Sequence, residues 1–340
     1  MQKNVLIALA IIGTLTAGLL LFRGQQAKKD ETNPDALREI YNQWKVTFKI
    51  NVGAAEDNYR YKVFSSNYGK INEHNKLLGR TYSLGLNPFT HLTQEEFAAT
   101  HLGLKVPKNI QKNVLPLSTD NLKETVDWAP KMNKVKNQGQ CGSCWAFSAV
   151  GAIEGLHSVV KGNLMDLSEQ ELVDCAGSFG NEGCNGGLMD SAFQYVMSVG
   201  GLASQEDYPY TATDGKCKTG LKRYGKITNF ADVPANSSAA LKAAIAKQPV
   251  AVAIEADTFT FQGYSGGVIN DNSCGTNLDH GVIAVGYSDG DSDNEASIPY
   301  YKVRNSWGAS WGEGGHVRIG IKDGAGICGI QQMASYPIAE

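Results

Sequence analysis

The sequence predicts an α+β fold with a helical lobe and an antiparallel β lobe, preceded by a small helical domain. Apolar residues recur at helical spacing in the first hundred residues. A segment that is apolar on nearly every face follows Cys144, as in a buried central helix. The second half of the chain switches to the period of two that strands show. Its alternating segments are 250–254, 282–285, 301–303 and 316–319.

Length and charge agree with a globular protein of more than one domain. The chain has 340 residues, of which 42% are hydrophobic, enough for a large core. Its formal net charge of −3 argues against a nucleic-acid partner. Residues 1–121 hold 15 Lys and Arg against 10 Asp and Glu (+5), and the rest hold 16 against 24 (−8). A basic N-terminal part and an acidic body should attract each other.

The first 24 residues form a hydrophobic leader. Lys3 precedes an uncharged run over 5–22, which is either a signal-peptide core or a signal anchor. Basic residues that follow the run would keep the downstream side of a retained anchor cytosolic. That orientation conflicts with disulfide formation, so we favour cleavage and keep the anchor as the alternative.

Two helices are predicted in the next domain, residues 33–103. The first begins at Pro34 and places Leu37, Tyr41, Trp44 and Phe48 on one face. In the second, six residues at spacings of four, four, three, four and four share a face. They are Glu56, Arg60, Phe64, Asn67, Ile71 and Asn75. Residues 104–121 are polar, lack periodicity and are interpreted as a linker.

The stretch from Gln138 to Phe147 should carry the chemistry. It places Cys144 in the first turn of the central helix, with Ser143 as its N-cap and Gly162 as its C-cap. Unpaired N–H groups and the helix dipole at that end favour the thiolate, so we expect a lowered thiol pKa. The Cys141-x-x-Cys144 pair could also be half a zinc site or a redox pair. Because no second ligand pair stands at the required spacing, we expect no metal.

Further helices of this lobe are predicted after the central one. Ser168 and Glu171, three residues apart, have the pattern of a capping box. Residues 190–199 predict another helix.

The motif Cys141-Gly-Ser-Cys144-Trp resembles the nucleophile motif of papain-like cysteine peptidases. His280 and Asn305 follow in the order that this family requires, and Gln138 matches its oxyanion-hole glutamine. The six-residue face of the second helix is similar to the ERFNIN pattern of cathepsin L-like propeptides. The resemblance implies a papain-like fold, with a helical lobe, an antiparallel β-barrel lobe and a helical inhibitory propeptide. It also implies a cysteine endopeptidase made as a zymogen, with residues 122–340 as the peptidase domain. The linker over 104–121 would cross the active-site cleft and be cut.

By this resemblance, a Cys144 thiolate and a His280 imidazolium would hydrolyse peptide bonds through a thioester acyl-enzyme. Asn305 would hold the imidazole, and Gln138 would stabilise the oxyanion together with the Cys144 backbone N–H. No metal or organic cofactor is implied. A non-catalytic relative, the alternative from another class, would be expected to lose Cys144, His280 or Gln138.

The resemblance also implies where a substrate binds. Gly186 and Gly187 would pair with the substrate backbone. The remaining predicted substrate-binding residues are Leu188, Met189, Ala253, Asp279, Gly281, Trp307 and Met333. Most of them would form an apolar pocket that prefers leucine, valine or phenylalanine at the second position before the scissile bond. No inserted loop with paired histidines follows Cys184, which favours an endopeptidase over an exopeptidase of the cathepsin B kind.

Six cysteines besides Cys144 allow fifteen pairings, between which spacing cannot choose. The resemblance implies Cys141–Cys184, Cys175–Cys217 and Cys274–Cys328. Disulfides require an oxidising compartment, so we expect the secretory pathway, ending in a lysosome-like acidic vacuole or outside the cell. The expected partners are protein and peptide substrates, the enzyme's own propeptide and cystatin-like inhibitors. We expect a monomer that contacts a membrane only if the leader is retained.

A second propeptide motif, 85–91, departs from the family pattern because His91 stands where an aspartate is usual. An imidazole titrates nearer to neutrality than a carboxylate. We therefore hypothesise that protonation of His91 loosens the propeptide at mildly acidic pH.

Overall fold

The computed structural model describes residues 34–107, 112–290 and 297–339. The predicted leader, 1–24, lies outside the described residues. The chain divides into two compact units, one ending at Ser65 and one beginning at Ser66. The division falls inside helix α3 (Asp57–Lys76), the second of the two predicted helices.

The first unit contains helix α2 (Pro34–Phe48) and the first turns of α3. The rings of Tyr41, Trp44 and Phe64 are buried and in contact, with centroids 5.1 to 5.7 Å apart. These are residues of the predicted apolar faces, so the helical pattern is confirmed. Asp57, at the start of α3, pairs with Arg38 and Lys45 of α2. A buried aromatic cluster and these ion pairs therefore join the two helices.

In the second unit, the last turns of α3 hold the chain that follows. Asn67 Nδ2 donates to the carbonyl oxygens of Thr90 and Leu92, and Asn75 exchanges two hydrogen bonds with Leu84. These asparagines belong to the predicted six-residue face. They fix strand β1 (Tyr82–Leu84) and the turn before helix α4 (Gln94–His101), which begins with a capping box from Thr93.

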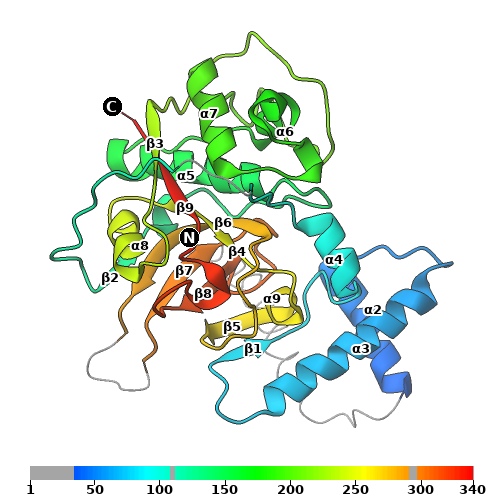
Figure 1. Ribbon diagram of the computed structural model, residues 1–340. Coiled ribbons are helices and arrows are strands. Elements are labelled where there is room, and N and C mark those ends of the chain that lie inside the picture. The colour runs from blue at the N-terminus through cyan, green and yellow to red at the C-terminus, as the bar shows by residue number, and fades with distance from the viewer. Residues whose placement is uncertain (1–33, 108–111, 291–296, 340) are drawn as a thin grey trace, which may run out of the picture. The chain divides into compact units, whose positions relative to one another are not determined.

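The helical lobe consists of α5 (Cys144–Lys161), α6 (Glu169–Cys175) and α7 (Met189–Val199). Figure 1 shows these helices gathered on one side of the second unit, with α5 next to the sheet, where Ser148 Oγ donates to the Val282 carbonyl oxygen of strand β6 (His280–Ser288). Every residue of α5 from Cys144 to Leu156 is buried, as the apolar pattern predicts, and Gly162 caps its C-terminus at φ 68°. Only half of the predicted capping box forms in α6. Ser168 accepts from the Glu171 N–H, but the Glu171 carboxylate binds Tyr195, Ala203 and Arg223 instead.

The β lobe is one sheet in which all four predicted strands are confirmed. Its path runs β1-β5-β8-β7-β6-β4-β9-β3, with β2 paired to β6. Every pair is antiparallel except β5 with β8. We expected a barrel, but the sheet is not closed: β1, from the N-terminal region, lies at one end of the strand order and β3 at the other. The strands after β1 are β2 (Thr125–Asp127), β3 (Asn229–Asp232), β4 (Val250–Ile254), β5 (Tyr264–Ile269), β6 (His280–Ser288), β7 (Tyr300–Arg304), β8 (His316–Gly320) and β9 (Ala334–Ile338).

Short helices complete the second unit. They are α8 (Ser238–Ile245) and α9 (Phe259–Gly263), with 3-10 turns at Ala129–Lys131, Ala176–Phe179, Gly183–Asn185 and Ile327–Gly329. Disulfides join Cys141 to Cys184 and Cys175 to Cys217 in the helical lobe, and Cys274 to Cys328 in the β lobe. These are the pairs that the resemblance implies. None of the helices described here is long and apolar enough to cross a bilayer.

Candidate active site

Cys144, the first residue of α5, is a free and fully buried cysteine. Burial raises the pKa of its thiol to about 11, although backbone hydrogen bonds from Gly281, Gly103 and Trp145 oppose this change. Our expectation of a lowered pKa is therefore wrong for this state of the chain. The physical reason is desolvation: the thiol has no access to water, and its position at the helix N-terminus does not compensate.

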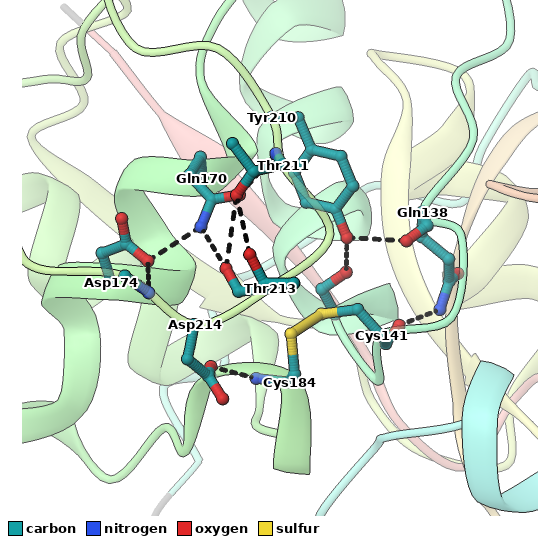
Figure 2. The surroundings of a disulfide bond; sticks show 12 residues. Gln138, Cys141, Gln170, Asp174, Cys184, Tyr210, Thr211, Thr213 and Asp214 are labelled. Atoms are coloured by element: carbon teal, nitrogen blue, oxygen red, sulfur yellow. Dashed lines mark hydrogen bonds between the residues drawn. A yellow bond between two sulfur atoms is a disulfide. The ribbon is translucent and has the colours of Figure 1, made fainter.

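The turn before Cys144 is held by polar contacts that the sequence does not reveal. Ser143 occupies the N-cap position, but its hydroxyl bonds with the Tyr210 hydroxyl at 2.6 Å instead of capping the helix. Tyr210 in turn donates to the Gln138 backbone carbonyl at 2.7 Å. Figure 2 shows the Cys141–Cys184 disulfide with Gln138 and Tyr210 on one side and Asp214 on the other. Gly142 N also donates to Cys184 O at 2.9 Å.

His280 and Asn305 meet where β6 begins and β7 ends. His280 Nε2 lies 2.8 Å from Asn305 Oδ1, and the Ser306 N–H donates to the same oxygen at 2.8 Å. Because the Ser306 N–H needs an acceptor, the shared atom of Asn305 is its amide oxygen. His280 Nε2 must therefore be protonated and donate its hydrogen to this oxygen. His280 Nδ1 is then the unprotonated nitrogen, and it is buried without a partner among the described residues.

The indole of Trp307 covers the His280 ring. The two rings are stacked with centroids 4.6 Å apart. Burial lowers the pKa of His280 to about 4, although its hydrogen bond to Asn305 opposes this. Both His280 and Cys144 are therefore uncharged in this structure.

Gln138 is fully buried, and its side chain is engaged at both ends. Nε2 donates to the carbonyl oxygens of His101 and Cys141, each at 2.9 Å. Oε1 accepts from Ser306 Oγ at 2.7 Å. The amide that we predicted to bind an oxyanion is thus aimed at a carbonyl oxygen of the N-terminal region.

Residues 101–105, named here the covering segment, run across the predicted site. Gly187 N donates to Gly103 O at 2.8 Å, and Lys105 N donates to Gly187 O at 2.9 Å. Leu104 N donates to Asp279 O at 3.0 Å. At Gly103, an added Cβ would overlap Gly142 O, so only glycine fits this position. The covering segment therefore occupies the backbone groups that we expected to bind substrate.

The residues of the predicted pocket form one apolar cluster. Leu104 belongs to it, and the predicted residues in it are Leu188, Met189 and Ala253, with Met333 packed against them. A Cβ added to Gly281 would lie 3.1 Å from Met189 Sδ. A leucine side chain of the covering segment is thus buried in the same apolar cluster as the side chains that we expected to surround a substrate residue.

Two predicted binding residues contribute their backbone. Gly186 adopts φ 119°, and a Cβ there would approach Gly103 O. Asp279 offers its carbonyl oxygen to Leu104, whereas its carboxylate accepts from the N–H groups of Ala256 and Asp257. Burial raises the pKa of the Asp279 carboxyl to about 7.

Three residues that sequence reasoning missed belong to this site: His101, Gly103 and Ser306. The predicted linker, 104–121, overlaps the covering segment only at residues 104 and 105, and residues 101–103 have no pattern that could reveal their place. Ser306 lies between two recognised residues, Asn305 and Trp307, but its bond to Gln138 depends on a long-range contact.

Comparisons with known proteins agree with this architecture. Residues 122–338 match the family model described as papain family cysteine protease, and residues 41–97 match the one described as cathepsin propeptide inhibitor domain. A probable cysteine protease of Arabidopsis thaliana, RD21C, is 44% identical over 349 residues, covering 98% of this chain and 75% of that protein.

Solved proenzyme structures are also similar. The recombinant stem bromelain precursor has a TM-score of 0.82 at 36% identity, covering 90% of this chain and 99% of that one. Digestive procathepsin L 3 of Tenebrio molitor larval midgut has a TM-score of 0.79 at 38% identity, covering 89% and 99%. These likenesses confirm the two-lobe fold with an N-terminal helical region.

Proposed function

The chain belongs to the papain family of cysteine proteases and carries its own inhibitory propeptide, and we propose that Cys144 and His280 perform its chemistry. The observation that carries this assignment is the proton arrangement of His280. Asn305 Oδ1 and the Ser306 N–H together leave the proton on Nε2, so Nδ1 is the nitrogen that can accept a thiol proton.

The covered and uncovered states should differ in the charge of this pair. In the covered state, burial favours the thiol and the neutral imidazole. When the covering segment leaves, water returns, and the N–H groups and dipole at the start of α5 favour the thiolate. The proton then moves from Cys144 Sγ to His280 Nδ1, which gives a thiolate–imidazolium pair.

Hydrolysis would proceed in two steps. The thiolate attacks the peptide carbonyl carbon, and the oxyanion accepts hydrogen bonds from Gln138 Nε2 and the Cys144 N–H. The C–N bond then breaks as His280 gives its proton to the leaving amine, which leaves a thioester. His280 next removes a proton from water, the hydroxide attacks the thioester, and the C–S bond breaks to release the acid.

His101 supports the role given to Gln138. Its carbonyl oxygen lies 2.9 Å from Gln138 Nε2, which is the separation expected between an oxyanion-hole donor and the oxyanion. We infer that the covering segment inhibits partly by filling this position with a peptide oxygen.

Leu104 supports the predicted specificity. Leu104 is 8% exposed and lies in the same cluster as Leu188, Met189 and Ala253. We propose that this cluster binds leucine, valine or phenylalanine at the second position before the scissile bond, and that the enzyme is an endopeptidase. Gly187 would pair with the substrate backbone, as it pairs with residues 103 and 105 here.

The three disulfides are consistent with a route through an oxidising compartment. We propose that the mature enzyme acts in a lysosome-like acidic vacuole or outside the cell. Binding of cystatin-like inhibitors and a monomeric state remain predictions.

The test compares wild type with Cys144→Ala after acidification of the full-length protein. Because the variant cannot process itself, its propeptide is cut by a trace of wild-type enzyme, which is then blocked with an alkylating agent and removed. Fluorogenic peptides with Phe-Arg or Arg-Arg before the bond report hydrolysis. We expect wild type to prefer Phe-Arg and Cys144→Ala to be at least about 10⁴-fold slower. A processed variant as active as wild type would exclude Cys144 as the nucleophile.

A further inference from the structure

A small cavity lies beside Asn305, between helices α5 and α6 and strands β6 and β7. Its volume is about 20 Å³, and the polar residues around it include Lys136, Glu154, Glu169, Arg304 and Asn305. A space of about 10 to 15 Å³ suffices for one water molecule if polar partners surround it. The cavity therefore has both the size and the chemistry of a water site.

Two residues that line this cavity each have a polar atom that is buried without a partner among the residues that the structure describes. These atoms are Nδ2 of Asn305, a donor, and Oε2 of Glu169, an acceptor. Asn305 is 3% exposed and Glu169 is 1% exposed, so bulk water does not reach them. A buried polar group left unpaired costs about 1 to 3 kcal/mol. One donor and one acceptor at the same cavity are what a water molecule needs to bridge.

The other atoms of these two groups are already engaged. Asn305 Oδ1 accepts from His280 and from the Ser306 N–H, so Nδ2 is the part of the amide left for the cavity. Glu169 Oε1 lies 2.7 Å from Lys136 Nζ, so Oε2 is the oxygen left for it. Lys136 also contacts Glu154 at 3.1 Å. Burial raises the pKa of the Glu169 carboxyl to about 7, although Lys136 opposes the change. Above that pH the group is a carboxylate fixed by an ion pair, and its second oxygen is free to accept.

We propose that water held in this cavity links Asn305 Nδ2 to the Glu169 carboxylate, and that Glu169 is a positioning residue for the His280–Asn305 pair. An amide can rotate by half a turn and exchange its oxygen and nitrogen. That rotation would turn an N–H₂ group toward an imidazolium and repel it. A carboxylate on the far side favours the amide orientation that presents Oδ1 to His280. The inference rests on the catalytic roles proposed above for His280 and Asn305.

The first test is a crystal structure of the proenzyme at about 1.5 Å resolution, which is independent of catalysis. We expect a water peak within hydrogen-bond distance of both Asn305 Nδ2 and Glu169 Oε2. A dry cavity, or an Asn305 amide that bonds directly to another group, would overturn the proposal and leave the assignment of Cys144 untouched.

The second test is Glu169→Gln, which keeps the side-chain shape. In the processed enzyme, normalised by active-site titration, we expect kcat to fall about tenfold with little change in KM. The basic limb of the pH profile of kcat/KM should move to lower pH, because the imidazolium is held less well. A purely structural defect would lower the amount of enzyme that active-site titration detects, but it would not move the basic limb of the pH profile.

Asp166→Asn is the matched control. Asp166 Oδ1 contacts the same Lys136 at 2.8 Å, but its side chain is 57% exposed and does not line the cavity. We expect wild-type kcat and pH profile from this variant. If Glu169→Gln also has the wild-type kcat and profile, or if Asp166→Asn reproduces its defect, the proposed link is wrong.

Discussion

The two lobes hold their proposed catalytic groups by different means. In the helical lobe, Gln138 and Cys144 lie in one short stretch, which the Cys141–Cys184 disulfide fastens beside the start of α5. In the β lobe, His280 and Asn305 are 25 residues apart and meet through the pairing of β6 with β7. Local sequence thus places one half of the site and strand register the other. We therefore expect local changes in the helical half to lower kcat. Loss of the disulfide in the β half should leave kcat unchanged.

The largest effect on the helical half is expected from Gln138→Ala. Loss of one oxyanion donor lowers kcat by about 10²- to 10³-fold. The variant also loses the hydrogen bond from Ser306 Oγ to the Gln138 side chain, which joins the two lobes. Steady-state kinetics of the processed enzyme on the Phe-Arg substrate would measure it. The control is Gln332→Ala, whose amide also donates to a carbonyl oxygen, that of Thr276, but outside the site. A loss of less than about threefold for Gln138→Ala would contradict the oxyanion role.

Removal of one disulfide from each lobe tests the comparison directly. Cys141→Ser with Cys184→Ser and Cys274→Ser with Cys328→Ser open loops of similar length, 43 and 54 residues. Each pair of changes should cost about 2 to 5 kcal/mol of stability. Only the Cys141→Ser, Cys184→Ser variant should also lower kcat, because the Gly142 N–H donates a hydrogen bond to the Cys184 carbonyl oxygen close to Cys144. Thermal unfolding and kinetics at low temperature separate the two effects, and equal losses of kcat would refute the distinction.

The same contrast explains how much the sequence could predict. Helix α5, its Gly162 cap and the four alternating strands follow from local periodicity and backbone preference, and all are present. The hydroxyl of Ser143 was assigned wrongly because Tyr210, distant in sequence, competes for it. The carboxylate of Glu171 leaves its capping box for Tyr195 and Arg223 for the same reason.

The state of the thiol could not be predicted from the motif. Helix position argues for a lowered pKa at Cys144, but burial outweighs it and raises the pKa to about 11. The covering segment contributes to that burial, and it is bound by backbone groups of Gly187 and Asp279, two residues that the resemblance implied as substrate-binding. A motif therefore identifies the reactive atom, whereas long-range packing decides its charge.

Gly103→Ala sharpens the comparison at the point where the covering segment meets the helical half. Its Cβ would overlap the backbone carbonyl of Gly142, which cannot move aside as a flexible side chain would. Overpacking of this kind costs about 1 to 3 kcal/mol, so the latent state should activate about tenfold faster or more. The rate of acid activation of the full-length protein measures this. Gly69→Ala is the control, because its Cβ would meet nothing within 4 Å, and an equally fast Gly69→Ala protein would remove the steric explanation.

The smallest effect is expected at His101, whose carbonyl oxygen accepts from Gln138 and whose ring packs within the N-terminal region. Its ring stacks on Phe97, meets Phe89 edge-on and bonds to Thr100 Oγ1 at 2.7 Å. Burial lowers its pKa to about 4, and the titratable groups that act on it are His91 and His280.

Because the buried ring is neutral, His101 supports the covered state fully above its exposed pKa of about 6.5, and this support is lost as pH falls toward about 4. His101→Phe keeps an aromatic ring but removes the titration. Its activation midpoint should therefore lie about half a pH unit lower than that of wild type, whereas Gly103→Ala should speed activation at every pH. Activation rates between pH 4 and 7 distinguish the two, and an unchanged midpoint in His101→Phe would assign the acid trigger elsewhere. His91→Asn then tests a second histidine of the N-terminal region, and a midpoint shift there would support the hypothesis that the sequence motif suggested.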